Sequence, residues 1–333
     1  MGNIQVSHAK RAIWDRAVMG GLFAFVLLGL VGLASATGWN ATIAQLGKLS
    51  LAAIGFLLLL SIANYAMRAA RWDLFARELG LETSFSTNAS HYIGGFAMTV
   101  TPGRVGELIR MRWLRCQTGW SYERTAPLAL VDRAADLAAM GLALGVAVAL
   151  STMGMTLALP VALASICAAV IATRPTLLAA LVSGFYRLTG RFPRAMARFR
   201  SAARTISVFS TPRVIIIAGV LSVLGWLAEG WAFSLLLQWM GAPLPFWSAV
   251  AIFLFATLAG GLTGAPGGLG GAEAAMVALL TLEGVPLDVA IAATAVIRLT
   301  TLWFAIGLGV IVFPFVEKAS KRAEKAGANG LEA

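Results

Sequence analysis

Residues 214–239 read VIIIAGVLSVLGWLAEGWAFSLLLQW, and this stretch decides the class of fold. It carries one ionisable side chain, Glu229, and it exceeds the roughly 20 apolar residues that a helix needs to cross a bilayer core. Four other stretches carry no Asp, Glu, Lys or Arg: residues 17–36, 49–67, 137–173 and 230–272. Of the 333 residues, 59% are hydrophobic and 12% are charged, too few charges to cover a soluble domain of this length. The sequence therefore predicts an all-α integral membrane protein.

The charge-free stretches predict a polytopic bundle of about six spanning helices. They lie near residues 17–36, 49–67, 127–151, 157–173, 214–239 and 287–313. Basic residues gather at 10–16, 68–77, 110–124, 174–213 and 318–325, and these clusters alternate along the chain with short loops that have none. Since basic residues flank membrane spans on the cytoplasmic side, both termini are predicted to be cytoplasmic, in a bacterial inner membrane. The net charge of +11 is thus assigned to topology and not to a nucleic-acid partner.

Two more apolar stretches, residues 88–101 and 246–263, each run into a Pro-Gly element. The elements contain Pro102 and Gly103 in the first case, and Pro266, Gly267 and Gly268 in the second. Proline removes a backbone donor and glycine tolerates unusual dihedral angles, so both elements should interrupt a helix at membrane depth. Such a break is tolerated only where protein buries it or where it lines a wet cavity. We expect two re-entrant helical hairpins that act as gates.

The hairpins belong to two similar segments of the chain. Residues 102–107 read PGRVGE and residues 266–273 read PGGLGGAE, and Gly119 precedes Arg133 by the same fourteen residues that separate Gly284 from Arg298. The offset is 164 residues between the prolines (266 − 102) and 165 between the arginines (298 − 133). The alternation of basic clusters places the two segments in opposite orientations across the membrane. Residues 49–151 and 214–313 are therefore predicted to be inverted repeats, with a basic cytoplasmic segment between them. Inverted repeats with interrupted helices are typical of secondary transporters.

Ionisable residues inside predicted spans or beside the two breaks are the candidate site. They are Arg104, Glu107, Asp132, Arg133, Asp136, Glu273 and Arg298. A charge in a span costs about 2.5–3.5 kcal/mol on insertion scales, so each one indicates a function by default. Guanidinium groups bind phosphate in bidentate fashion, which favours a phosphate-bearing headgroup as the ligand. The alternative is that these charges pair with one another, for example Arg298 with Glu107 or with an aspartate of the other repeat; for Asp136 and Glu229 the two readings are balanced.

The remaining reactive side chains are isolated. Cys116 and Cys167 have no CxxC spacing, and His8 and His91 are the only histidines, so the sequence predicts no disulfide framework, metal site or cofactor. Residues 183–210 hold six basic residues and no acid. Their apolar positions recur at intervals of three and four, which favours an amphipathic helix on the cytoplasmic leaflet over a solvated loop.

The motifs at Pro102–Glu107, at Asp132, Arg133 and Asp136, at Pro266–Glu273 and at Arg298 resemble, in combination, those of the lysylphosphatidylglycerol synthase transmembrane-region family. The resemblance covers roughly residues 17–313. It implies a flippase-like bundle with two re-entrant elements that exchanges a lipid between leaflets. About twenty residues follow the last predicted span, so we expect no synthase domain after it.

The leading hypothesis is a lipid translocase in which Arg104, Arg133 and Arg298 hold a headgroup phosphate. Membrane lipids are then its partners, and a lipid-synthesis enzyme and a second copy of the chain remain open as others. A membrane-embedded transferase is the alternative, and only Asp132 or Glu107 offers it an acid–base group. An accessory subunit of a lipid pathway is a third interpretation.

Overall fold

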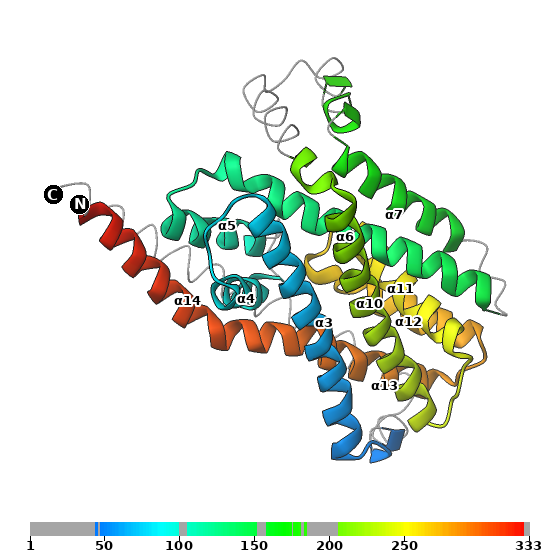
Figure 1. Ribbon diagram of the computed structural model, residues 1–333. Coiled ribbons are helices and arrows are strands. Elements are labelled where there is room, and N and C mark those ends of the chain that lie inside the picture. Colours follow the sequence, from blue (N-terminus) through cyan, green and yellow to red (C-terminus); the bar gives the residue numbers. More distant parts are fainter. Residues whose placement is uncertain are drawn as a thin grey trace.

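The computed structural model describes residues 44–45, 47–99, 105–151, 158–174, 176–180, 183–184 and 206–329, and within these ranges it consists of helices and loops without a strand (Figure 1). The first half contains α3 (Leu51–Glu78), α4 (Phe85–Gly94), η1 (Gly95–Met98), α5 (Val105–Thr118), α6 (Tyr122–Leu150) and α7 (Ala158–Thr173). The second half contains η3 (Ile206–Ser210), α10 (Pro212–Trp239), α11 (Phe246–Leu262), η4 (Pro266–Gly268), α12 (Gly271–Leu282), α13 (Leu287–Arg298), η5 (Leu299–Trp303) and α14 (Phe304–Asn329).

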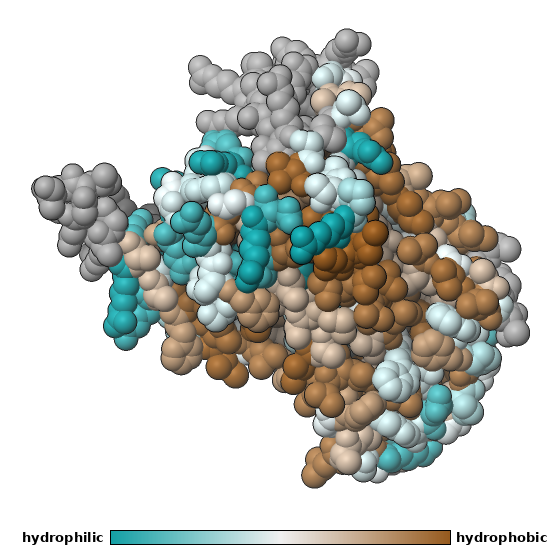
Figure 2. All heavy atoms as spheres, viewed as in Figure 1, coloured by the Kyte–Doolittle hydropathy of each residue, from teal (hydrophilic) through white to brown (hydrophobic). Residues whose placement is uncertain are grey.

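Four helical stretches are long and apolar enough to cross a membrane. They are α3, α6, α10 and the continuous helix Leu287–Glu324, which joins α13, η5 and α14. Large hydrophobic side chains point outward from them; on α10, Ile216, Val220 and Leu224 are exposed at intervals of four residues and form one outer face. Figure 2 shows hydrophobic residues over most of the visible surface. The expectation of an all-α membrane protein is therefore confirmed, whereas the number of six crossings stays a prediction.

Two expected boundaries differ from the structure. The helix predicted to end at residue 67 continues as α3 to Glu78, because Arg68 and Arg71 find acidic partners inside the bundle instead of ending the helix in water. The helix predicted at 287–313 extends through Glu324 and contains a π-helical turn, η5, in which the Phe304 amide bonds to the Leu299 carbonyl. Helix α7 has 16 residues and lies against α6. The predicted span at 17–36 lies outside the described residues.

The second Pro-Gly element interrupts the helix as predicted. Helices α11 and α12 pack against each other, and η4 between them has a non-helical residue, Gly267, with φ 65°. A Cβ on Gly260 would lie 2.7 Å from the Ala272 Cβ, so the two helices meet at a contact that only glycine allows. Of the first element, Pro102, Gly103 and Arg104 lie outside the described residues. Its flanks meet closely, since a Cβ on Gly106 would lie 2.6 Å from the Gly95 carbonyl oxygen.

The inverted relation between the two halves is not tested by these helices and stays a prediction. The basic segment 183–210 is described only at residues 183–184 and 206–210. There, Ile206 and Phe209 of η3 are buried, and the Phe209 ring lies 5.5 Å from that of Phe75 in α3. The rest of that segment lies outside the described residues.

Substituting Gly141 with alanine should destabilise the packing of α7 on α6. A Cβ there would lie 2.8 Å from the Ala162 carbonyl oxygen, whereas a Cβ on Gly145, one turn along α6, meets nothing within 4 Å. Overpacking costs about 1–3 kcal/mol. Thermal unfolding in detergent should show a lower midpoint for Gly141→Ala and an unchanged or higher midpoint for Gly145→Ala. Equal midpoints would contradict this account of the contact.

Candidate functional site

Asp132 and Asp136 stand one turn apart on α6, and both bind Arg71 of α3. The Arg71 Nε and Nη2 donate to Asp132 Oδ1 at 3.1 and 2.5 Å, and Nη1 donates to Asp136 Oδ1 at 2.9 Å. Nη1 also donates to Ser222 Oγ of α10 at 2.6 Å. Arg71 has 0% exposure, so these bonds lie inside the bundle. This one guanidinium thus links α3, α6 and α10.

Two further arginines complete the ion pairs on these aspartates. Arg68 Nη2 donates to Asp136 Oδ2 at 2.8 Å, and Arg133 Nη2 donates to Asp132 Oδ2 at 2.8 Å. Arg133 Nη1 also lies 3.3 Å from Asp136 Oδ2, and its Nε lies 3.2 Å from Glu107 Oε1 at the start of α5. The side chains of Arg133 and Glu107 are 26% exposed, so the cluster opens on their side.

Arg298 forms a second pair, in the other half of the chain. Its Nε donates to Glu273 Oε1 at 2.6 Å, and its Nη2 donates to the Gly267 carbonyl at 2.9 Å. Arg298 therefore links α13 to α12 and to the break that precedes α12. Neither of the partners proposed for it from sequence, Glu107 or an aspartate of the other repeat, is bonded to it; Glu273 is nearer because the hairpin folds back onto α13.

Arg110 of α5 is a buried cation on an aromatic platform. Its guanidinium carbon lies 4.1 Å from the ring centre of Tyr92, 5.5 Å from that of Trp72 and 5.7 Å from that of Phe96. Its side chain is buried, and its Nε and Nη1 have no hydrogen-bond partner in the part of the chain that the structure describes. The rings shelter this cation from water, and its interpretation as a cytoplasmic flanking residue stays a prediction.

The buried charges form one set, which we call the ionic core. It comprises Arg68, Arg71, Arg110, Arg133, Arg298, Glu107, Asp132, Asp136, Glu229 and Glu273. Six of the seven residues predicted from sequence to lie in spans or beside the breaks meet as two groups: Glu107, Asp132, Arg133 and Asp136 come together, and Glu273 joins Arg298. Arg104 lies outside the described residues.

Sequence reasoning missed Arg68, Arg71 and Arg110, which were read as topology signals. A signal was present for the first two: they are three residues apart on the helical face that also carries Trp72 and Tyr65, both buried. An arginine pair on an aromatic helical face is compatible with burial as well as with a cytoplasmic end. Asp132 and Asp136, which need cationic partners, indicate the same.

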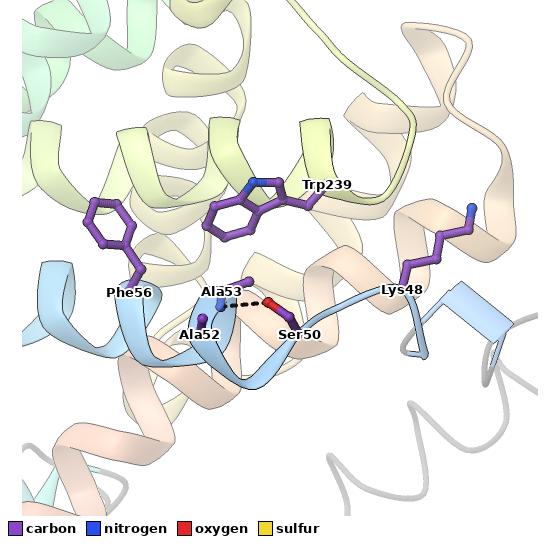
Figure 3. Close-up of a pocket in the computed structure, with 6 residues that line it drawn as sticks. All are labelled: Lys48, Ser50, Ala52, Ala53, Phe56 and Trp239. Atoms are coloured by element: carbon purple, nitrogen blue, oxygen red, sulfur yellow. Dashed lines mark hydrogen bonds between the residues drawn. The ribbon is translucent and has the colours of Figure 1, made fainter.

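An open pocket of about 390 Å³ lies at the other end of α3. Lys48, Ser50, Ala52, Ala53, Phe56 and Trp239 line it, and Figure 3 shows Phe56 and Trp239 at its wall and Lys48 at its margin. Ser50 precedes Arg71 by 21 residues, or about 30 Å along a helix. No member of the ionic core lines this pocket. Because the predicted ligand-binding charges lie in the ionic core, the ionic core and not the pocket is the candidate site.

Long apolar helices with outward hydrophobic faces and a buried ionic core define a helical integral membrane protein of the multi-helix type. A family model described as the lysylphosphatidylglycerol synthase TM region matches residues 17–309. The chain belongs to this family, which confirms the resemblance inferred from its motifs.

Two relatives in Methanothermobacter thermautotrophicus (strain Delta H), each named a UPF0104 membrane protein, are similar to parts of the chain. One is 36% identical over 108 residues, which is 32% of this chain and 31% of the relative. The other is 29% identical over 140 residues, which is 40% of this chain and 41% of the relative. Each alignment thus spans less than half the length of the relative.

Proposed function

We propose that this protein is a lipid translocase that moves a phospholipid or another phosphate-bearing lipid between the leaflets of the cytoplasmic membrane. The observation that carries the proposal is the ionic core, because arginines buried between apolar helices, such as Arg71, Arg110 and Arg298, are costly unless they serve a function. A guanidinium is the side chain best matched to a phosphate. Family membership supports a role in the membrane.

Within this proposal the arginines have different roles. Arg71 is enclosed and bonded to two carboxylates and a hydroxyl, so it holds helices together. Arg133 is the partly exposed member of its cluster and receives the headgroup phosphate, with Glu107 released from it or turned to a cationic headgroup. Arg298 binds the headgroup phosphate in the second half of the chain, next to the break, because it bonds directly to Gly267 there. Arg104 remains in the proposed site as an expectation from sequence.

The same proposal makes the protein a transporter and not an enzyme. A lipid that changes leaflet needs a polar path for its headgroup and no bond making or breaking. The basic cluster at 318–325 supports a cytoplasmic C-terminus. Membrane lipids are the proposed partners, and an enzyme that makes the transported lipid would be a natural neighbour.

Lipid exchange should fail when Arg298 is replaced. Purified protein is reconstituted into vesicles that carry a fluorescent short-chain phospholipid, and the fraction that reaches the outer leaflet is followed by bleaching with dithionite. Arg298→Ala should lower the exchange rate to that of protein-free vesicles, because the phosphate loses a guanidinium worth about 1.5–3 kcal/mol per charged hydrogen bond. Arg213→Ala, at an exposed arginine at the start of α10, is the matched control and should exchange normally.

A second variant separates loss of function from loss of fold. Arg298→Ala leaves Glu273 buried without its partner, whereas Arg298→Gln/Glu273→Gln removes both charges together. The double variant should keep the thermal stability of the native protein and still fail to exchange lipid. Normal exchange in it would refute the role of Arg298, and the absence of exchange by the native protein for any phospholipid would refute the translocase.

A further inference from the structure

Glu229 is the acidic residue of the ionic core that has no ion pair. It lies deep in α10 and is 5% exposed. Within the described ranges, no lysine or arginine nitrogen lies within 4.0 Å of its carboxylate, and no hydrogen bond reaches it. Glu107, Asp132, Asp136 and Glu273 each hold an arginine within that distance.

Charged groups from both halves of the protein face Glu229. Helix α10 packs against α3, α6, α11, α13 and η3. Among the titratable groups on these elements, Tyr65 and Arg68 of α3, Asp136 of α6 and Arg298 of α13 interact electrostatically with Glu229. Helix α11 and η3 carry no ionisable side chain. Glu229 therefore lies within electrostatic reach of Arg68 and Asp136 in the first half and of Arg298 in the second.

Both nearby arginines already have partners. Arg68 binds Asp136 at 2.8 Å and Arg298 binds Glu273 at 2.6 Å. A carboxylate buried without a partner is strongly disfavoured and becomes neutral by taking up a proton. The arrangement described by the structure therefore suits the neutral acid form of Glu229.

We propose that Glu229 is a proton-binding site that couples lipid movement to the proton gradient. The carboxylate takes up a proton from water on one side of the membrane and releases it on the other side. In its ionised form it competes with Glu273 for Arg298. When Arg298 turns to Glu229 it gives up the Gly267 carbonyl, which frees the break before α12 to move.

This coupling rests on the proposed translocase function, and a pH gradient tests it. Vesicles containing the protein and a fluorescent phospholipid receive a gradient of one pH unit, and the lipid is measured in each leaflet at equilibrium. One proton per lipid would drive an asymmetry of up to about tenfold per pH unit, in a direction set by the gradient and independent of protein orientation. Glu229→Gln should abolish the dependence of the lipid distribution on the pH gradient.

Glu283→Gln is the matched control, because Glu283 is an exposed acid at the end of α12. It should keep the native response to the gradient. Equal leaflets in native vesicles that exchange lipid would overturn the coupling and leave the translocase standing. Native vesicles that exchange no lipid would overturn both.

A second measurement needs no lipid transport and guards against a misfolded variant. Infrared difference spectroscopy between neutral and alkaline buffer, where exposed carboxylates stay ionised, should show the C=O band of a protonated carboxylic acid in the native protein. Glu229→Gln should lack this band and Glu283→Gln should retain it. A native protein without the band, or a Glu229→Gln protein that keeps it, would overturn the assignment of the proton to Glu229.

Discussion

Arg71→Leu is expected to destabilise the protein more than any other single charge removal in the ionic core. The substitution leaves Asp132 and Asp136 without the guanidinium that bonds to both and removes the bond to Ser222 on α10. Breaking a buried pair by removing one partner costs about 3–5 kcal/mol, because an uncompensated charge remains. Thermal unfolding in detergent micelles, followed by circular dichroism, measures the effect.

The same helix offers a matched control. Arg77 pairs with Asp73 at 2.7 Å, but its side chain is 62% exposed. Arg77→Leu should therefore cost only about 0–1 kcal/mol. The double variant Arg71→Leu/Asp132→Leu also removes one of the two carboxylates that lost their partner. Arg68 and Arg133 still pair with the other, Asp136, so part of the lost stability should return. Arg71→Leu and Arg77→Leu with equal stability would show that the buried network does not hold the helices.

The second large effect is expected at Gly309, where α14 meets η1. A Cβ on Gly309 would lie 2.3 Å from the Ala97 amide nitrogen and 2.8 Å from the Phe96 carbonyl carbon. Both are backbone atoms that no rotamer change can move. Gly309→Leu should therefore separate α14 from η1 and cost at least the about 1–3 kcal/mol typical of overpacking.

Gly307 provides the comparison within the same helix. A Cβ there meets nothing within 4 Å, and replacing glycine in a helix is otherwise favourable by about 1 kcal/mol. Gly307→Leu should thus leave the unfolding midpoint unchanged or raise it. The contact of η1 with α14 would be refuted if the two leucine variants unfolded at the same temperature.

The sequence predicts the helical membrane class and most of the charged site for one physical reason. A carboxylate or guanidinium in an apolar run, such as Asp132 or Arg298, is conspicuous because lipid cannot solvate it. The Pro-Gly-Gly break at residues 266–268 is predictable for a similar reason, since proline and glycine disfavour a continuous helix.

The partners of these charges could not be derived in the same way. Arg68 and Arg71 follow an apolar stretch, where a cytoplasmic end and a buried salt bridge leave the same pattern. Tertiary packing of α3 on α6 decides between the two. Nor does any proline or glycine mark the π-helical turn at Leu299–Trp303, where the Tyr65 hydroxyl donates to the Thr301 carbonyl. That turn depends on a neighbour more than 230 residues away in the chain.

The π-helical turn also changes the direction in which the last long helix faces. A regular helix advances about 100° per residue, so positions 298 and 309, eleven residues apart, would point within about 20° of each other. One wider turn between them takes up an extra residue and rotates the two positions apart by about 100°. Arg298 consequently faces and bonds to α12, while Gly309 faces and packs against η1. The helix Leu287–Glu324 is thereby in contact with both hairpins. A rotation of one half of this helix about the helix axis would therefore also turn its other half.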